Sequence, residues 1–314
     1  MLFQQVDRPP LFAEGIRSTV LASWQQQGLA DNKLADLFIY DTRDEFEPDL
    51  EPRPEPVRWP ESTADLQEFR KLLDPDDPKR LPSDWEARIR SWRNREYPLM
   101  LQVNEGFFLA MGVEGWQQFS RTLYLTRDDP AFVRDLLQIH GEFAAELASH
   151  ILDQIDVDAV IFSEPIGGNH GPLISPTMYR SLVLPSYQPL FEVVERHQVE
   201  TVILRSYANI RILLPALVEA GINCLWACES DSAAMDFVDI RREYGSSLRL
   251  IGGIDTDWLY GSEQVMRANL ERAVPPLLAG GGYIPLADGR VREAMPFAKY
   301  QAYRLALQQV VQNL

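Results

Sequence analysis

The sequence predicts a single α/β domain of the (β/α)8 TIM-barrel class, spanning residues 1–314. Short apolar, β-branched runs alternate with helical patterns, which is typical of parallel strands joined by helices. The clearest unit is Val199 to Ala208, in which the apolar run Thr201 to Leu204 stops at Arg205-Ser206-Tyr207. A helical run opens at Asn209 directly after it. Because parallel α/β folds carry their chemistry at the carboxyl ends of the strands, Arg205 and Tyr207 are expected to face a substrate.

The N-terminal part contains one helix, one strand and a proline-rich stretch. A helical pattern follows Pro9-Pro10 and ends at Gly28, and residues 34–41 read as a strand that ends at Tyr40-Asp41. The stretch around 43–62 is rich in Pro and Glu and is expected to be an excursion or edge hairpin, since proline interrupts a central strand. Further elements are expected at 62–73 (helix), 84–95 (helix), 98–104 (strand), 129–154 (helix) and 158–164 (strand).

The C-terminal half repeats the strand-then-helix pattern. Ser175-Pro176 is an N-cap followed by proline, and it predicts a helix that reaches about His197. Strands are expected at 222–229, 247–255 and 282–288, and helices at 231–244, 262–280 and 296–313. Seven strands are thereby counted, and the eighth strand of a closed barrel is expected in the proline-rich N-terminal region.

Composition excludes several classes of function. The net charge of −16 argues against a nucleic-acid partner. No stretch of about 18 apolar residues is present, so no membrane span is expected, and the N-terminus lacks the features of a signal peptide. Two cysteines, Cys224 and Cys228, suit a reducing compartment, which predicts a cytoplasmic protein without disulfides.

Polar residues stand at nearly every predicted strand end, and a barrel would bring them to one mouth. They are Asp41, Asn104, Glu105, Glu164, Arg205, Tyr207, Glu229, Asp255 and Asp288. Arg205 is the strongest candidate, because a fixed guanidinium suits carboxylate or phosphate recognition. Each acid could instead cap a following helix, as Asp255 could, and Arg205 could instead pair with a strand-end acid such as Glu164.

The remaining reactive side chains carry weaker signals. Cys224 falls inside a strand and is expected in the core, whereas Cys228 stands at a strand end without a neighbouring histidine in sequence. His170, in the loop PIGGNHG, could contribute acid–base chemistry or bind a metal. The sequence contains no GxGxxG, GxxxxGK[ST], CxxC or HExxH motif, so no metal or cofactor is expected.

Several stretches resemble the uroporphyrinogen decarboxylase superfamily. They are residues 172–190, 202–225, 235–259 and 281–291, and more loosely 7–29. The resemblance implies a (β/α)8 barrel that is often a homodimer. It also implies one of two activities, since the superfamily includes the cofactor-free decarboxylase of haem synthesis and zinc-dependent methyltransferases that work with corrinoid proteins.

The chain departs from both groups at residues that carry their chemistry. The methyltransferases have a His-x-Cys pair where this sequence has Arg205 and Tyr207, and a further Cys where it has Asp288. Arginine and tyrosine are poor zinc ligands, so the resemblance does not extend to zinc. The decarboxylase has an N-terminal segment rich in Arg and Gly that grips the tetrapyrrole's carboxylates, and this chain keeps only Arg8 and Arg17 there.

These observations favour a metal-independent, decarboxylase-like lyase acting on a small acidic molecule. Arg205 would bind a carboxylate or stabilise the developing anion, and Glu164, Asp288 or Tyr207 would move the proton. The other residues expected to contact the substrate are Asn104, Glu105, His170, Glu229 and Asp255. Two alternatives stay open: a methyltransferase acting with a corrinoid protein or a methylated small molecule, and a non-catalytic binding or partner subunit. The stretch Gly106 to Phe119 is a candidate dimer surface.

Overall fold

The computed structural model describes Phe3 and residues 8–30, 34–228, 234–287 and 291–313. Its centre is a sheet of seven strands that all run parallel, in the order β1-β2-β3-β6-β7-β8-β9. The strands are β1 (Asp44–Phe46), β2 (Leu99–Asn104), β3 (Ala159–Glu164), β6 (Val202–Tyr207), β7 (Cys224–Cys228), β8 (Arg249–Ile254) and β9 (Tyr283–Ala287). The predicted α/β class with a parallel sheet is confirmed.

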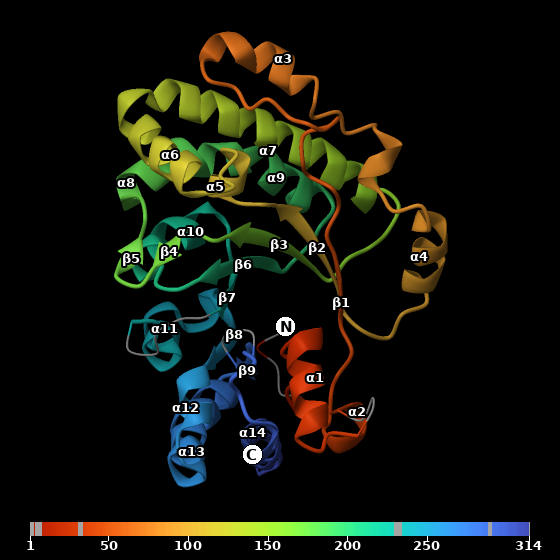
Figure 1. The fold of residues 1–314 in the computed structure, drawn as a ribbon, viewed down its shortest axis with the longest axis vertical. Helices are drawn as coiled ribbons and strands as arrows, with labels where there is room; N and C mark the ends of the chain where they lie inside the picture. The colour runs from red at the N-terminus through yellow and green to blue at the C-terminus, as the bar shows by residue number, and fades with distance from the viewer. Residues whose placement is uncertain (1–2, 4–7, 31–33, 229–233, 288–290, 314) are drawn as a thin grey trace.

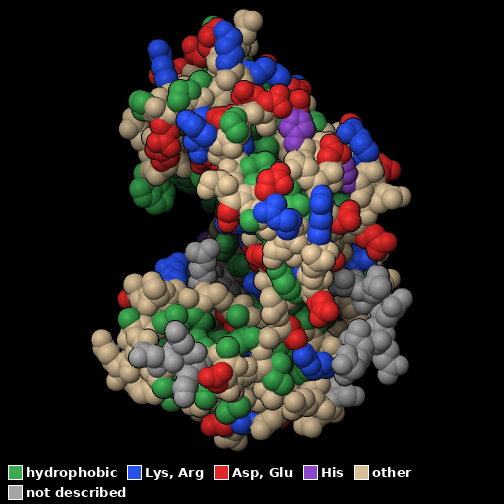
Figure 2. Space-filling view, turned by 90° about the vertical axis from the view of Figure 1, so that its right-hand side faces the viewer, with side chains coloured by type: hydrophobic (Ala, Val, Ile, Leu, Met, Phe, Trp, Pro, Cys, Tyr) green, Lys and Arg blue, Asp and Glu red, His purple; other side chains and the backbone are tan. Residues whose placement is uncertain are grey.

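The sheet is curled but open. Within the described residues, β1 and β9 form its two edges and are not hydrogen-bonded to each other, so a closed eight-stranded ring is not seen. A short antiparallel hairpin of β4 (Gly167–Gly168) and β5 (Gly171–Pro172) follows β3 as a separate sheet. In the space-filling view, a deep notch opens on the left side of the molecule between its upper and lower parts (Figure 2).

Helices cover the outer, convex side of the curled sheet (Figure 1). The long helix α7 and helix α9 pack against each other above β2, β3 and β6. The helices of the first half are α1 (Ser18–Gln26), α2 (Leu34–Leu37), α3 (Leu66–Arg70), α4 (Trp85–Trp92), α5 (Phe107–Ala110), α6 (Trp116–Asp128) and α7 (Pro130–Leu152). Those of the second half are α8 (Pro176–Met178), α9 (Leu184–Arg196), α10 (Leu214–Ala220), α11 (Phe237–Tyr244), α12 (Thr256–Tyr260), α13 (Glu263–Ala279) and α14 (Phe297–Gln312).

Several helix boundaries follow the predicted caps. Asp129 accepts a hydrogen bond from the Phe132 N–H and is followed by Pro130, so α7 begins where the sequence predicted. Ser175 caps α8 in the same way, and a π-helical turn, η3 (Tyr179–Val183), joins it to α9. No helix of the described residues is long and apolar enough to cross a membrane.

Each strand has one face toward the helices and one toward the concave side. On β6, for example, Val202, Leu204 and Ser206 face the helices, and Ile203, Arg205 and Tyr207 face the concave side, since side chains alternate along a strand. Buried apolar side chains accordingly form two clusters. A large one lies between sheet and helices, and a smaller one lies on the concave side.

The N-terminal region differs from the prediction. Residues 34–41 do not form a strand: α2 ends at Leu37, and Asp41 accepts hydrogen bonds from Arg8 at 2.6 and 2.7 Å and from the Leu11 N–H at 2.6 Å. The helix expected from residue 11 begins only at Ser18. The preceding segment is held instead by Glu14, which is buried and accepts a hydrogen bond from Arg304 of α14 at 2.9 Å. The buried ion pair, rather than helical periodicity, fixes this segment.

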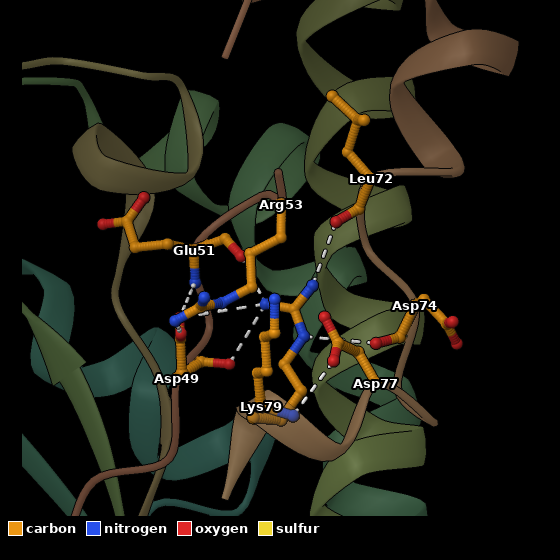
Figure 3. A network of polar contacts seen from close by, with 8 residues as sticks. Asp49, Glu51, Arg53, Leu72, Asp74, Asp77 and Lys79 are labelled. Atoms are coloured by element: carbon orange, nitrogen blue, oxygen red, sulfur yellow. Dashed lines mark hydrogen bonds and ion pairs between the residues drawn. The ribbon is translucent and has the colours of Figure 1, made fainter. Parts of the chain in front are cut away.

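The proline-rich stretch contains β1 and then crosses the surface as a strap, defined here as residues 47–60. Buried Arg80, in the 3-10 turn η2 (Pro78–Arg80), binds it to the rest of the protein. Figure 3 labels the residues around this contact, among them Asp49, Glu51, Leu72 and Asp74. The guanidinium donates hydrogen bonds to the backbone carbonyls of Asp49, Glu51, Leu72 and Asp74. It also lies over the Phe143 ring of α7 at 4.6 Å. One arginine thus joins the strap, the end of α3 and α7.

Candidate functional site

The candidate site lies on the concave face of the sheet, toward the carboxyl ends of the strands. Ser163 of β3, Arg205 of β6 and Trp226 of β7 stand in one register row across three neighbouring strands. Residues in register on parallel strands point to the same side of the sheet, so these three side chains face the concave side together. This row lies above the apolar cluster that contains Ile161 and Ile203.

Arg205 is the centre of a polar network. Its guanidinium donates hydrogen bonds to Glu45 at 2.7 Å, to Glu47 at 3.0 Å and to Gln102. It also lies over the Trp226 ring, 5.6 Å from the ring centroid. Burial acts to lower the pKa of Arg205, but Glu45 and Glu47 outweigh it and raise the pKa above its ordinary value. Arg205 is therefore a fixed cation. Its partners come from β1, from Glu47 directly after β1 and from β2, and not from Glu164.

A second guanidinium, that of Arg43, lies on the same face. It stacks against the rings of Phe12 and Trp226, at 4.8 Å from each centroid, and pairs with Glu45 at 3.2 Å. Burial lowers its pKa, and its buried Nη1 atom has no hydrogen-bond partner. Glu45 thus bridges two cations, and Trp226 contacts both of them. The buried part of this site holds more positive than negative charge, because Glu47 is mostly exposed.

Two further side chains of the concave face stand one row higher. Tyr207 and Cys228 are register partners on β6 and β7, and both are partly exposed. Cys224 is fully buried four residues earlier on β7, where burial raises the pKa of its thiol to about 12. The prediction that Cys224 is a core residue is confirmed.

Glu164 does not join this network. Its side chain lies on the convex side of β3, fully enclosed by helices, and accepts hydrogen bonds from the Phe107 N–H at 3.1 Å, from Tyr179 at 3.2 Å and from Tyr187. Burial raises its pKa to about 7. The expectation that Glu164 converges with Arg205 was wrong, because the alternation of side chains along β3 turns Ser163, and not Glu164, to the concave face.

Asn104 is the last residue of β2, and Glu105 follows it near the strap residues Glu47 and Glu51. The Oδ1 atom of Asn104 accepts a hydrogen bond from the Ser163 N–H at 2.8 Å, so this residue ties β2 to β3 at an irregularity of their pairing. Burial, with Glu51 and Glu47 nearby, raises the pKa of Glu105 to about 7. Among the described residues Glu105 has no hydrogen-bond or ion-pair partner, and a carboxyl group with a pKa near neutrality suits proton transfer.

The other predicted site residues are spread around the same end of the sheet. His170 is exposed at the tip of the β4–β5 hairpin, where it makes no hydrogen bond within the described chain. Asp255 follows β8 and caps α12 by accepting a hydrogen bond from the Asp257 N–H at 2.8 Å, which is the alternative role considered from sequence. Glu229 and Asp288 lie outside the described residues.

The sequence analysis did not identify the residues on and beside β1 and β2 that surround Arg205. Arg43, Glu45 and Glu47 fall in a stretch that looked like a solvated, proline-rich excursion, and Gln102 lies inside an apolar strand. The alternation of Arg43, Glu45 and Glu47 at a spacing of two, which places them on one face of a strand, is the signal that could have found them.

The fold and this site define an α/β protein with a polar network at the carboxyl ends of its parallel strands. A family model described as uroporphyrinogen decarboxylase (URO-D) matches residues 48–286, about three quarters of the chain. The chain belongs to the uroporphyrinogen decarboxylase superfamily, which contains decarboxylases and methyltransferases.

Among solved structures, the chain is similar to a methyltransferase from Methanosarcina mazei. The two share 14% sequence identity with a TM-score of 0.59, over 98% of this chain and 95% of the other. Xylanase B from Clostridium stercorarium F9 aligns with a TM-score of 0.41 and 12% identity, over 71% of this chain and 76% of the other. A search of curated proteins finds no match. At these identities the structural similarity shows the fold alone.

The residues of the concave face do not fit the zinc site of the superfamily's methyltransferases. Arginine and tyrosine, which the sequence resemblance predicts in place of that site's imidazole and thiolate ligands, are poor zinc ligands, and Arg205 is already bound by two carboxylates. Among the residues that the structure describes, no group of three or more His, Cys, Asp or Glu side chains lies close enough to hold a metal ion.

Proposed function

We propose that this chain is an enzyme that removes a carboxyl group, as CO2, from a small acidic molecule bound at the concave face. The observation that carries the proposal is the position of Arg205, held between Glu45 and Glu47 above Trp226. A guanidinium fixed in this way is preorganised to bind a substrate carboxylate, since it presents planar donors in a partly desolvated site.

A substrate carboxylate would take the place of Glu47. Of the two acidic partners, Glu47 is the more exposed, with 56% of its side chain accessible against 22% for Glu45. It can therefore turn into solvent at low cost, while Glu45 keeps Arg205 in place. Arg43, with its unpartnered Nη1 atom, supplies additional positive potential on the same face.

The proposed chemistry needs a carboxylate anchor and a proton donor. When the bond to the carboxyl carbon breaks, its electron pair stays on the substrate carbon as CO2 leaves, and a proton must then reach that carbon. Tyr207 is the donor that we assign, because it shares the concave face of β6 with Arg205. Burial raises the pKa of Glu105 to about 7, but Glu105 lines a cavity with residues of α7 and α9, so we do not assign the proton to it. Asp288 keeps the role expected from sequence but lies outside the described residues.

The test is CO2 release from a panel of small aromatic and aliphatic carboxylic acids, followed for the wild type, Arg205→Lys and Tyr207→Phe. Loss of the paired donors of Arg205 is expected to lower kcat/KM by about 30- to 150-fold. Tyr207→Phe should lower kcat with little change in KM. Undiminished turnover in Arg205→Lys would remove Arg205 from the mechanism.

A corrinoid-linked methyltransferase is the second candidate. It is favoured by the fold similarity to a methyltransferase and by the Cys228 thiol on the concave face beside Tyr207. Methyl transfer from methylcobalamin that depends on Cys228, with no CO2 release from any acid of the panel, would favour this candidate. A binding subunit without turnover would bind acids and catalyse neither reaction.

A further inference from the structure

The chain turns sharply directly after Tyr207, the side chain assigned above as the proton donor. Ala208 has a backbone φ of +54°, in the left-handed region that residues other than glycine rarely adopt. Its N–H donates a hydrogen bond to the Cys228 carbonyl at 3.0 Å, which fixes the turn to the neighbouring strand β7. A backbone of this kind is strained and persists only where its surroundings hold it, which is common at active sites.

The β4–β5 hairpin lies against this turn (Figure 1). The Asn209 N–H donates a hydrogen bond to the Gly168 carbonyl at 3.1 Å, and the two residues form an antiparallel bridge. Asn209 also accepts a hydrogen bond from the Arg211 N–H at 3.0 Å, at the start of the 3-10 turn η4 (Arg211–Leu213). The chain is therefore tied to the hairpin one residue after the strained turn.

Gly167 allows the hairpin to approach the Tyr207 backbone closely. A Cβ atom at position 167 would overlap with the Tyr207 carbonyl oxygen, and it would also lie 3.1 Å from the Cγ2 atom of Ile210. Any other residue at this position would have to move either the hairpin or the peptide after Tyr207. Gly168 differs, because the atom nearest to a Cβ there is the Gly171 carbonyl oxygen, at 3.1 Å and within the hairpin itself.

Arg205, two residues before Tyr207, is held by other parts of the chain. Its guanidinium is bound by Glu45, Glu47 and Gln102, which come from β1, the residue after it and β2. The carboxylate anchor and the proton donor of the proposed reaction are thus fixed separately. A change at the hairpin should therefore disturb Tyr207 and leave the anchor in place.

We propose that Gly167 and Ala208 are positioning residues for Tyr207. The hairpin fixes the peptide that follows Tyr207, and through it the direction of the phenol on the concave face. The inference rests on the proposed function, in which Tyr207 donates the proton. Proton transfer requires hydrogen-bond reach, and a displacement of about 1 Å can lower a rate by about 100-fold.

Ala208→Gly tests the turn. Glycine adopts a positive φ without strain, so the Tm of the variant should not fall, but the backbone behind Tyr207 loses rigidity. We expect kcat for CO2 release to fall about three- to tenfold with KM unchanged. The matched control is Gln198→Gly, because Gln198 is exposed before the other end of β6 and has a φ of +57°. It should leave kcat unchanged, and equal kcat values in the two variants would overturn the role of the turn.

Gly167→Ala tests the hairpin with a readout that does not require turnover. In protein labelled with 3-fluorotyrosine, the fluorine NMR resonance of Tyr207 is identified by its loss in Tyr207→Phe. Gly167→Ala should shift this resonance and lower kcat about 10- to 100-fold, and Gly168→Ala should leave both nearly unchanged. An unchanged Tyr207 resonance in Gly167→Ala, or an equal shift in both glycine variants, would overturn the proposal.

The same resonance separates this proposal from the proposed function. If the wild type releases no CO2 from any acid but Gly167→Ala shifts the resonance, the proposed function fails and the positioning of Tyr207 by the hairpin stands. If Gly167→Ala does not fold, the resonance of Ala208→Gly decides: a change in its position or width that Gln198→Gly does not show supports the proposal, and no change overturns it.

Discussion

Arg205 of β6 and Glu45 of β1 form an ion pair with an N–O distance of 2.7 Å, although two other strands lie between them in the sheet. Neighbouring strands are about 4.8 Å apart, so β1 and β6 would be separated by roughly 14 Å in a flat sheet. The curl of the sheet brings these two side chains toward each other across its concave face. The ion pair therefore reports the curvature of the sheet and supports it.

Removing the guanidinium should destabilise the fold. Arg205→Ala leaves Glu45 with Arg43 as its remaining partner, and leaves Gln102 without its donor. We expect a loss of about 1.5–3 kcal/mol in the free energy of unfolding, measured by denaturant titration. The control is Arg211→Ala, whose partner Glu243 is half exposed, and it should cost less than about 1 kcal/mol. Equal losses in the two variants would argue against a structural role for the Arg205 network.

The stability of the protein should depend on the titration of Glu164. Burial raises the pKa of Glu164 to about 7 in the folded chain, whereas a glutamate in an unfolded chain titrates near about 4.3. The folded state binds this proton more tightly, so the contribution of Glu164 to stability is complete below about pH 4 and is lost as the pH rises through 7. Between about pH 4.3 and pH 7, the free energy of unfolding should fall by up to about 1.4 kcal/mol per pH unit.

Glu164→Gln isolates this contribution. The amide can still accept a hydrogen bond from the Phe107 N–H and can donate to Tyr179 or Tyr187. Chemical denaturation at pH 4.5, 5.5, 6.5 and 7.5 should therefore show a shallower decline for the variant than for the wild type. Glu142→Gln is the control, because Arg70 and Gln138 lower the pKa of Glu142. Its stability should decline with pH as steeply as that of the wild type. Parallel curves for the wild type and Glu164→Gln would refute the assignment.

Arg80 should be required for the strap. Arg80→Met removes hydrogen bonds to four backbone carbonyls and leaves those acceptors inside the protein, which we expect to cost about 2–4 kcal/mol. Limited proteolysis should cut the variant first within residues 47–60. Lys79, the neighbouring exposed cation in Figure 3, provides the control, and Lys79→Met should be cut at the rate of the wild type. A strap equally protected in both variants would contradict this role of Arg80.

The parallel architecture could be predicted from sequence because buried strands and capped helices leave strong local signals. Apolar runs such as 158–164 and the Asp129-Pro130 cap depend only on neighbouring residues. The N-terminal region could not be predicted in this way. Asp41 is fixed by Arg8, and Glu14 by Arg304 at the far end of the chain, so long-range ion pairs override the local pattern there.

Only part of the candidate site could be predicted, because local patterns identify strand ends but not the contacts between distant segments. Arg205 and Tyr207 follow a strand with a clear end, and strand alternation places both on the concave face. Glu164 is the last residue of β3, as Tyr207 is the last residue of β6, but its side chain points to the helices. Side chains alternate along a strand, so a shift of one residue places a side chain on the opposite face of the sheet. Glu45 and Glu47 became visible only when the sheet placed β1 across from β6.

Homodimerisation is a further prediction. Only some residues of the predicted dimer surface are exposed in the structure. Within Gly106 to Phe119, Phe107, Phe108 and Met111 are buried in the core, whereas Trp116 is 83% exposed. On α6, Tyr124 is exposed two turns further along, on the same side of the helix. Sedimentation at micromolar concentration should show a dimer whose dissociation constant rises at least about tenfold in Trp116→Ser. A monomeric wild type would remove the prediction.

The most direct test of the account is whether a dicarboxylate competes with Glu47 for Arg205. Thermal unfolding would be followed with malonate, succinate and phthalate for the wild type, Arg205→Lys and Glu47→Gln. We expect at least one acid to raise the Tm of the wild type. Glu47→Gln should bind it more tightly because the competing carboxylate is gone, and Arg205→Lys should bind it about 30- to 150-fold more weakly. The same affinity in all three proteins would show that Arg205 does not bind the acid.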